Sequence, residues 1–173
     1  MKSVFLSIVA VLAFAPLTQA ADVTVKISNV HLCCPGCVKG VAKAVAGIHG
    51  VKATADMDTE AVEITGPDTA AVQKAADALV KAGYFGESSD PSIKMSSDTG
   101  AKGVKVQSLK VQGVHLCCPK CVKAVNAALK DVPGVTGNNA AKNAKFFTVT
   151  GDFNDADVFA ALQKIGLTGK VAP

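Results

Sequence analysis

The chain has 173 residues and a formal net charge of +4, with 49% hydrophobic residues, no tryptophan and one tyrosine. Its lysines are scattered among aspartates and glutamates, without the basic stripe and interleaved aromatic residues of a nucleic-acid-binding surface, so no nucleic-acid partner is expected. Because most apolar side chains are small and aliphatic, we expect one or more small domains.

Residues 1–20 have the pattern of a secretory signal peptide. Lys2 precedes an apolar run from Val4 to Leu17, and small residues ending in Ala20 follow. The run is shorter than the roughly 20 residues that span a bilayer, and no later run approaches that length. We therefore expect cleavage after Ala20, export to the periplasm or the extracellular space, and no membrane insertion of the mature chain.

A seven-residue phrase occurs twice, as HLCCPGC at residues 31–37 and as HLCCPKC at residues 115–121, and holds all six cysteines. The residues around it keep the offset of 84 that separates Cys34 from Cys118, which predicts a tandem repeat. A stretch rich in Gly, Ser, Asp and Lys between the copies predicts a flexible linker. We expect three parts after the signal peptide: a first domain at 21–87, the linker at 88–103 and a second domain at 104–173.

The elements of the first copy follow from hydrophobic spacing. Alternation before the cysteine phrase predicts a strand, and a helical period after it predicts an amphipathic helix. Turn-forming glycines then separate a second strand, a third strand and a second helix that ends at Gly83. The apolar positions of these elements are, in chain order, Val23, Val25 and Ile27, then Val38, Val41, Ala42 and Val45, then Val51, then Val62 and Ile64, and then Val72, Ala75, Ala76 and Leu79.

The second copy repeats this order. Residues 136–145 have poor strand propensity and predict a longer loop or a ragged hairpin, and the third strand is expected to close on Gly151. Short tails beginning at Tyr84 and Leu167 complete each copy with a fourth strand. The resulting order is β-α-β-β-α-β, the ferredoxin-like order of an α+β fold. The apolar positions of the second copy are Leu109 and Val111, then Val122, Val125 and Leu129, then Val135, then Phe147 and Val149, and then Val158, Ala161, Leu162 and Ile165.

Each phrase places a C-x-x-C pair across the predicted turn from a strand into a helix: Cys34 and Cys37, and Cys118 and Cys121. Two sulfurs at this spacing bind one ion, and a helix N-terminus favours the thiolate form of the second cysteine. Thiolates prefer Cu(I), Zn(II) or other thiophilic ions over Mg(II) and Ca(II). The sequence therefore predicts a soft-metal site in each copy.

These loops resemble the G-M-[TS]-C-x-x-C motif of the heavy-metal-associated domain, found in copper chaperones, metal-transport ATPase N-termini and the periplasmic mercuric-ion binding protein. The resemblance covers nearly all of the predicted mature chain, twice. Ala82-Gly83-Tyr84 also looks like the family's ending of the second helix, where an aromatic residue lies near the metal loop, whereas the second copy has Ile165-Gly166-Leu167. The resemblance implies that the metal ligands are Cys34, Cys37, Cys118 and Cys121.

The chain departs from this motif at three positions of each phrase: histidine replaces glycine, leucine replaces methionine, and a third cysteine replaces threonine or serine. The extra Cys33 or Cys117 would make a two-coordinate site trigonal, provided that the backbone bends so that adjacent cysteines face one ion. His31 or His115 would complete a Cys3His set suited to zinc. Both additions remain open, as does an ion shared between the copies.

The function expected from these features is buffering of a soft ion, or its handover to a membrane transporter or a recipient metalloprotein. No catalytic motif of a hydrolase or a phosphate-binding enzyme is present, so no enzyme is expected. The alternative is thiol-disulfide exchange by the same cysteines. Structural disulfides are disfavoured, because three cysteines in each copy leave one unpaired.

Overall fold

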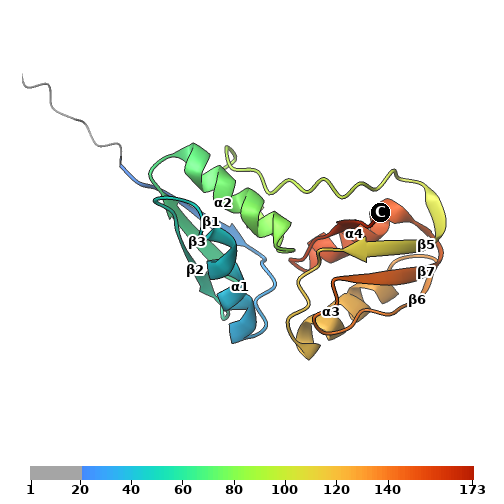
Figure 1. The fold of residues 1–173 in the computed structure, drawn as a ribbon. Coiled ribbons are helices and arrows are strands. Elements are labelled where there is room, and N and C mark those ends of the chain that lie inside the picture. Colours follow the sequence, from blue (N-terminus) through green and yellow to red (C-terminus); the bar gives the residue numbers. More distant parts are fainter. Residues whose placement is uncertain (1–20) are drawn as a thin grey trace, which may run out of the picture.

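The computed structural model describes residues 21–173, so the predicted signal peptide lies outside the described part of the chain. The described residues form two units that lie side by side (Figure 1). Each unit has a four-stranded antiparallel sheet and two helices, which makes the fold α+β. Within residues 21–173, no helix combines the length and the apolar character needed to cross a membrane.

The first unit has the strand order β2-β3-β1-β4, as expected for a ferredoxin-like sheet. The alternation in β1 pairs Val25 with Ile64 and Ile27 with Val62, and all four side chains are buried beneath the helices. The predicted stripe of the second helix is likewise buried. The elements are β1 (Val23–Ser28), α1 (Pro35–Val45), β2 (Lys52–Asp56), β3 (Ala61–Gly66), α2 (Thr69–Lys81) and β4 (Glu87–Ser88).

The second unit repeats this topology with the order β6-β7-β5-β8. The segment predicted as a longer loop or a ragged hairpin contains both: β6 has only four residues and its register with β7 shifts between Val135 and Gly137, and residues 139–145 form a loop. The third strand does not close on Gly151, because this glycine adopts a φ of 140° beside the backbone of Gly134 and lets β7 continue. The elements are β5 (Lys105–Gln112), α3 (Pro119–Lys130), β6 (Val135–Asn138), β7 (Phe146–Asn154), α4 (Asp155–Lys164) and β8 (Lys170–Val171).

The sequence predicted that the tails after α2 and α4 begin the fourth strands at Tyr84 and Leu167. In the structure the fourth strands begin three residues later, at Glu87 and Lys170. Tyr84 and Leu167 instead form an antiparallel bridge with each other, across the junction between the two units. The Phe85 N–H donates to the Gly166 carbonyl, and the Thr168 N–H donates to the Gly83 carbonyl, both at 3.0 Å. The strands β4 and β8 start only after this pairing, so backbone hydrogen bonds join the two units.

Gly83 and Gly166 allow this close approach. Both have positive φ angles, 90° and 75°. A Cβ on Gly83 would meet the backbone of Gly113 and His115, and a Cβ on Gly166 would meet the backbone of the equivalent loop in the first unit. Each helix-ending glycine therefore packs against the other unit's loop, next to its cysteine phrase, and only glycine fits there.

The segment that the sequence assigned to a flexible linker, 88–103, makes defined contacts with the first unit. Ser88 belongs to β4. Ile93 is only 2% exposed. The Gln73 side chain donates to the Lys94 carbonyl and accepts from the Lys94 N–H, both at 2.8 Å. These contacts fasten the beginning of the segment to α2.

The end of the same segment is fastened to the second unit by Asp155, the first residue of α4. This carboxylate is 4% exposed and accepts hydrogen bonds from the N–H groups of Lys102 at 2.9 Å and Val104 at 3.0 Å. Burial raises the pKa of the Asp155 carboxyl, but these backbone N–H groups outweigh it, and the pKa lies below the usual value. The carboxylate therefore holds the chain at its entry into β5.

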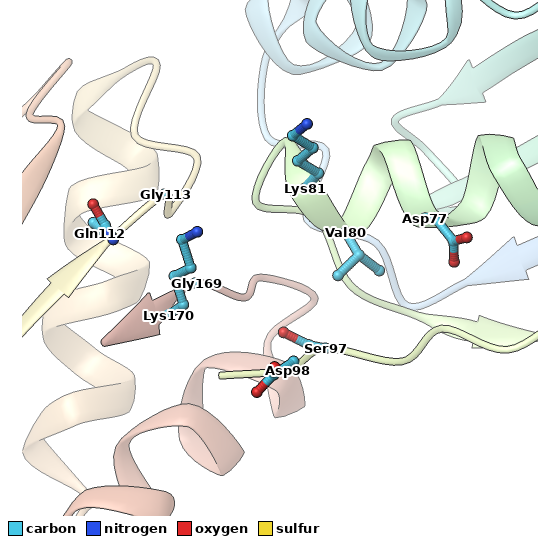
Figure 2. A pocket seen from close by; sticks show the side chains of 9 residues that line it. All are labelled: Asp77, Val80, Lys81, Ser97, Asp98, Gln112, Gly113, Gly169 and Lys170. Atoms are coloured by element: carbon cyan, nitrogen blue, oxygen red, sulfur yellow. The ribbon is translucent and has the colours of Figure 1, made fainter. Parts of the chain in front are cut away.

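Between these two attachments, the segment lines one side of a hollow of about 320 Å³ at the junction with α2 and β8 (Figure 2). The hollow carries balanced charge from two aspartates and two lysines, and neither cysteine nor histidine reaches it. Its lining residues are Asp77, Val80, Lys81, Ser97, Asp98, Gln112, Gly113, Gly169 and Lys170. The sulfur chemistry of the chain therefore lies elsewhere on the junction.

Candidate metal centre

Both C-x-x-C pairs occupy the first turn of a helix. Cys34 and Cys118 are the N-cap residues of α1 and α3, with extended φ and ψ angles, and a proline follows each at the first helical position. Proline suits this position because its fixed φ matches the helix and its missing N–H has no intrahelical partner to lose. Cys37 and Cys121 lie one turn further in and are fully buried. Each pair therefore combines a half-exposed sulfur with a buried one.

The backbone bends at Cys34 and at Cys118, which brings the third cysteine of each phrase to the same site. The Cys33 Sγ lies 3.8 Å from the Cys37 Sγ, and the Cys117 Sγ lies 3.7 Å from the Cys121 Sγ. Leu32 and Leu116, between the histidine and the cysteines, are buried and hold each loop against its core. The bend that simultaneous ligation requires is thus present in both units.

The two cysteine loops face each other across the junction, so that all six sulfurs form one cluster. The Cys33 Sγ lies 3.5 Å from the Cys118 Sγ and 3.4 Å from the Cys121 Sγ. The Cys117 Sγ lies 3.5 Å from the Cys34 Sγ and 3.6 Å from the Cys37 Sγ. All six thiols are free, and every one of them has a neighbour from the other loop within 4.0 Å.

The spacing of these sulfurs fits an ion of low coordination number. With a metal–sulfur bond of about 2.3 Å, trigonal coordination separates two sulfurs by about 4.0 Å, and linear coordination separates them by about 4.6 Å. The triangle of Cys34, Cys37 and Cys117 has edges of 3.8, 3.5 and 3.6 Å, near the trigonal value and well below the linear one. The cluster therefore suits a soft metal bound by three or more sulfurs drawn from both units.

The thiols differ in pKa: the pKa values of Cys34 and Cys121 are lowered, and those of Cys37 and Cys117 are raised. Burial raises the pKa of Cys34. Hydrogen bonds from the N–H groups of Cys37 and Gly36 and the contact with the Cys117 thiol lower it by more, so that the net pKa is about 7. A hydrogen bond between Cys37 and Cys121 raises the pKa of Cys37 and lowers that of Cys121, so this buried pair holds one proton. Burial raises the pKa of Cys117 to about 12. An ion that binds all these sulfurs must displace protons.

The two histidines of the phrases lie in different surroundings. His115 stacks on Tyr84 of the first unit, with 4.5 Å between the ring centroids, and its Nε2 lies 3.0 Å from the Tyr84 hydroxyl. That hydroxyl also donates to the Cys37 carbonyl at 2.8 Å. In the part of the chain that the structure describes, the Nε2 of His31 is buried and has no hydrogen-bond partner.

Gly40, in the middle of α1, also belongs to this site, although it lies outside the cysteine phrase. A Cβ there would overlap the Tyr84 hydroxyl and approach the His115 Cε1 to 2.8 Å. Glycine inside a helix is unfavourable by about 1 kcal/mol relative to alanine, and that cost is the signal for close packing. The equivalent position of the second unit, 84 residues later, is Ala124.

Two curated proteins that are similar to this chain are copper-transporting ATPases. No family model matches the chain. It is 31% identical over 140 residues to Copper-transporting ATPase 2 of Rhizobium meliloti (strain 1021), and 35% identical over 106 residues to Copper-transporting ATPase 1 of the same organism. The alignments cover 77% and 59% of this chain, which spans only 14% and 10% of the lengths of these relatives.

Among solved structures, the N-terminal soluble domains of Bacillus subtilis CopA match 88% of this chain and 95% of their own. The sequence identity is 17% and the TM-score is 0.33.

Proposed function

Since the two units are heavy-metal-associated-like domains with copper-transporting ATPases among their relatives, we propose that the chain is an exported protein that binds a soft metal ion. Cu(I) is the favoured ion, and Zn(II) or another thiophilic ion is the alternative. The observation that carries the proposal is the convergence of six free thiols. The proposed ligands are Cys33, Cys34, Cys37, Cys117, Cys118 and Cys121.

The proposed ion is held between the two units rather than inside one of them. Four of the separations across the junction, 3.4 to 3.6 Å, are as short as those within each loop, and the Cys37 and Cys121 sulfurs lie 4.0 Å apart. An ion placed among Cys34, Cys37 and Cys117 takes ligands from both loops without a large movement. Six thiolates in this arrangement also offer bridging sulfurs, so we include a small Cu(I) cluster in the proposal.

Handover would proceed by ligand exchange. Cys34 and Cys118 are half-exposed, whereas Cys37 and Cys121 are buried, so a sulfur of a recipient reaches the ion on the side of the two N-cap cysteines. The incoming sulfur adds to the ion while one of these cysteines leaves. The proposed recipient is a membrane metal transporter or a metalloprotein, and storage of the ion without transfer uses the same ligands.

Thiol-disulfide exchange is the second candidate, favoured by the low pKa of Cys34, about 7, at a helix N-terminus. Its reactive pair would be Cys34 and Cys37, whose sulfurs lie 3.8 Å apart. The metal-binding proposal accounts for more of the site, because exchange needs two thiols and leaves the other four without a role.

The test is to purify the chain anaerobically from the exported fraction and to compare its mass under native and denaturing conditions. We expect metal in the native mass that denaturation removes, and six reduced thiols. A single ion shared between the loops would give one ion per chain, two separate C-x-x-C sites would give two, and more than two ions would indicate the cluster. A metal-free protein with disulfides, which binds neither Cu(I) nor Zn(II) tightly after reduction, would support thiol-disulfide exchange instead. The double variant Cys37→Ser/Cys121→Ser is the control for binding at the loops.

A further inference from the structure

The two histidines are equivalent in sequence, but only one has a ring nitrogen committed to the protein. The Tyr84 hydroxyl has one hydrogen, which it donates to the Cys37 carbonyl. The Nε2 of His115, 3.0 Å from the same hydroxyl, must therefore act as the donor in its contact with Tyr84. With its proton there, the Nε2 of His115 has no lone pair to offer to a metal. Among the described residues, His115 also belongs to none of the sets of three ligand atoms that lie within 4.8 Å of one another, so its other ring nitrogen is not placed beside two sulfurs.

His31 lacks this partner because the second unit differs at two positions. Leu167 stands where the first unit has Tyr84, and Leu167 is fully buried without a hydroxyl to offer. Ala124 stands where the first unit has Gly40, the residue that makes room for the tyrosine and histidine. The Nε2 of His31 is left buried and unpaired among the described residues, a costly arrangement unless a ligand satisfies it.

The His31 ring lies beside two sulfurs of the cluster, one from each unit. A ring nitrogen of His31, the Cys33 Sγ and the Cys121 Sγ lie within 4.8 Å of one another, and the two sulfurs are 3.4 Å apart. Trigonal coordination with bonds of about 2.1 Å to nitrogen and 2.3 Å to sulfur needs a nitrogen–sulfur separation of about 3.8 Å. A shift of at most about 1 Å therefore closes the set around one ion.

We infer that His31, and not His115, is a nitrogen ligand to the soft ion, in a site completed by Cys33 and Cys121 across the junction. This inference rests on the proposed binding of a soft metal. Imidazole is neutral, so a Cu(I) ion with two thiolates and His31 carries one negative charge less than the same ion with three thiolates. In a buried cluster that already contains several thiolates, the lower charge is easier to accommodate.

The direct test uses the imidazole ¹⁵N chemical shifts of the full chain, recorded anaerobically before and after addition of Cu(I), which is diamagnetic. We expect a large shift of one His31 nitrogen upon binding, while the Nε2 of His115 keeps its protonated-nitrogen shift. Binding of Cu(I) by the thiols without any shift at His31 would overturn the inference and leave the proposed function intact. Failure of the wild-type chain to bind Cu(I) or Zn(II) would overturn both.

A matched pair of variants, His31→Leu and His115→Leu, separates a ligand from a structural residue. His31→Leu removes a buried Nε2 that has no hydrogen-bond partner among the described residues, so the metal-free variant should lose less stability to urea than His115→Leu, with Cu(I) affinity at least about tenfold weaker. His115→Leu should lower the urea midpoint of the metal-free protein, because it removes the partner of Tyr84. Wild-type Cu(I) affinity in a folded His31→Leu variant would contradict the assignment.

Discussion

Tyr84 and His115 stack across the junction although they belong to different units, and the tyrosine hydroxyl joins His115 to the Cys37 carbonyl. This contact links the end of α2, the first cysteine loop and the histidine of the second phrase. The aromatic residue near the metal loop, which the family resemblance implied for the first copy, thus reaches both units.

Tyr84→Phe removes this hydroxyl and leaves the ring in place. Because the side chain is fully buried, the His115 nitrogen and the Cys37 carbonyl both lose a partner, and we expect a loss of about 1–3 kcal/mol in the free energy of unfolding. Urea denaturation of the metal-free chain measures it. The control is Thr24→Val, which removes an exposed hydroxyl and should change stability by less than about 0.5 kcal/mol. Equal effects would show that the buried contact contributes nothing special.

Gly83→Ala should open the junction. The substitution places a methyl group against the backbone of Gly113 and His115, in addition to the cost of a positive φ. Gly103→Ala is the control, because Gly103 also has a positive φ, 70°, but nothing lies within 4 Å of its added Cβ. We expect both variants to lose about 1 kcal/mol from backbone strain. Only Gly83→Ala should increase the radius of gyration in small-angle X-ray scattering.

Cys33→Ser tests whether the third cysteine of the phrase is a ligand. Loss of groups that merely orient a metal ligand weakens binding by 10- to 100-fold, so loss of a ligand should weaken Cu(I) binding by at least about tenfold. Competition with a chromophoric Cu(I) chelator measures the affinity. Cys34→Ser is the reference, since its C-x-x-C position matches the family motif. A Cys33→Ser variant with wild-type affinity would restrict the site to the C-x-x-C pairs.

Asp155 should make stability depend on pH in the acid range. Its folded-state pKa lies below the usual 3.8, so its contribution to stability is complete above that value and is lost as the pH falls through the folded pKa. Urea denaturation between about pH 2 and pH 6 should show this loss in the wild type and a smaller one in Asp155→Asn. Asp155→Ala should cost about 1–3 kcal/mol at neutral pH, through the unpaired N–H groups of Lys102 and Val104.

Ile93→Ala tests how firmly the linker is held. Ile93 is 2% exposed, and removal of such a side chain costs about 2–5 kcal/mol in a core, with the lower end expected for a surface segment that adjusts. The Lys94 N–H donates a hydrogen bond to the Gln73 side-chain oxygen, and its hydrogen exchange should accelerate in the variant. Val104→Ala, at a side chain 48% exposed, should leave that exchange unchanged. Rapid exchange already in the wild type would support the flexible linker that composition predicts.

The sequence predicts the elements of each unit well, because alternation and helical spacing report local structure. The stripes through Val25 and Ile27, and through Val72 and Leu79, are buried as their periodicity indicates. No sequence pattern predicts that the two cysteine loops meet. Their contact depends on backbone hydrogen bonds between the segments at Gly83 and Gly166, and backbone groups are the same for every sequence.

The same distinction explains the candidate site. The six cysteines stand out by their spacing, whereas the different roles of His31 and His115 depend on residues far away in the chain. Tyr84 has an aromatic ring and a hydroxyl that Leu167 lacks, and this difference distinguishes the two histidines only once the two units are in contact.

Joining both units in one chain has a consequence that two identical subunits would not permit. A two-fold symmetric dimer must carry the same residue at both ends of its interface, so a change that favours one site is imposed on the other. Here the bridge between Tyr84 and Leu167 joins unlike residues at positions that a symmetric dimer would make identical. One half of the interface is thereby free to specialise in holding the units together, while the other half stays available for chemistry.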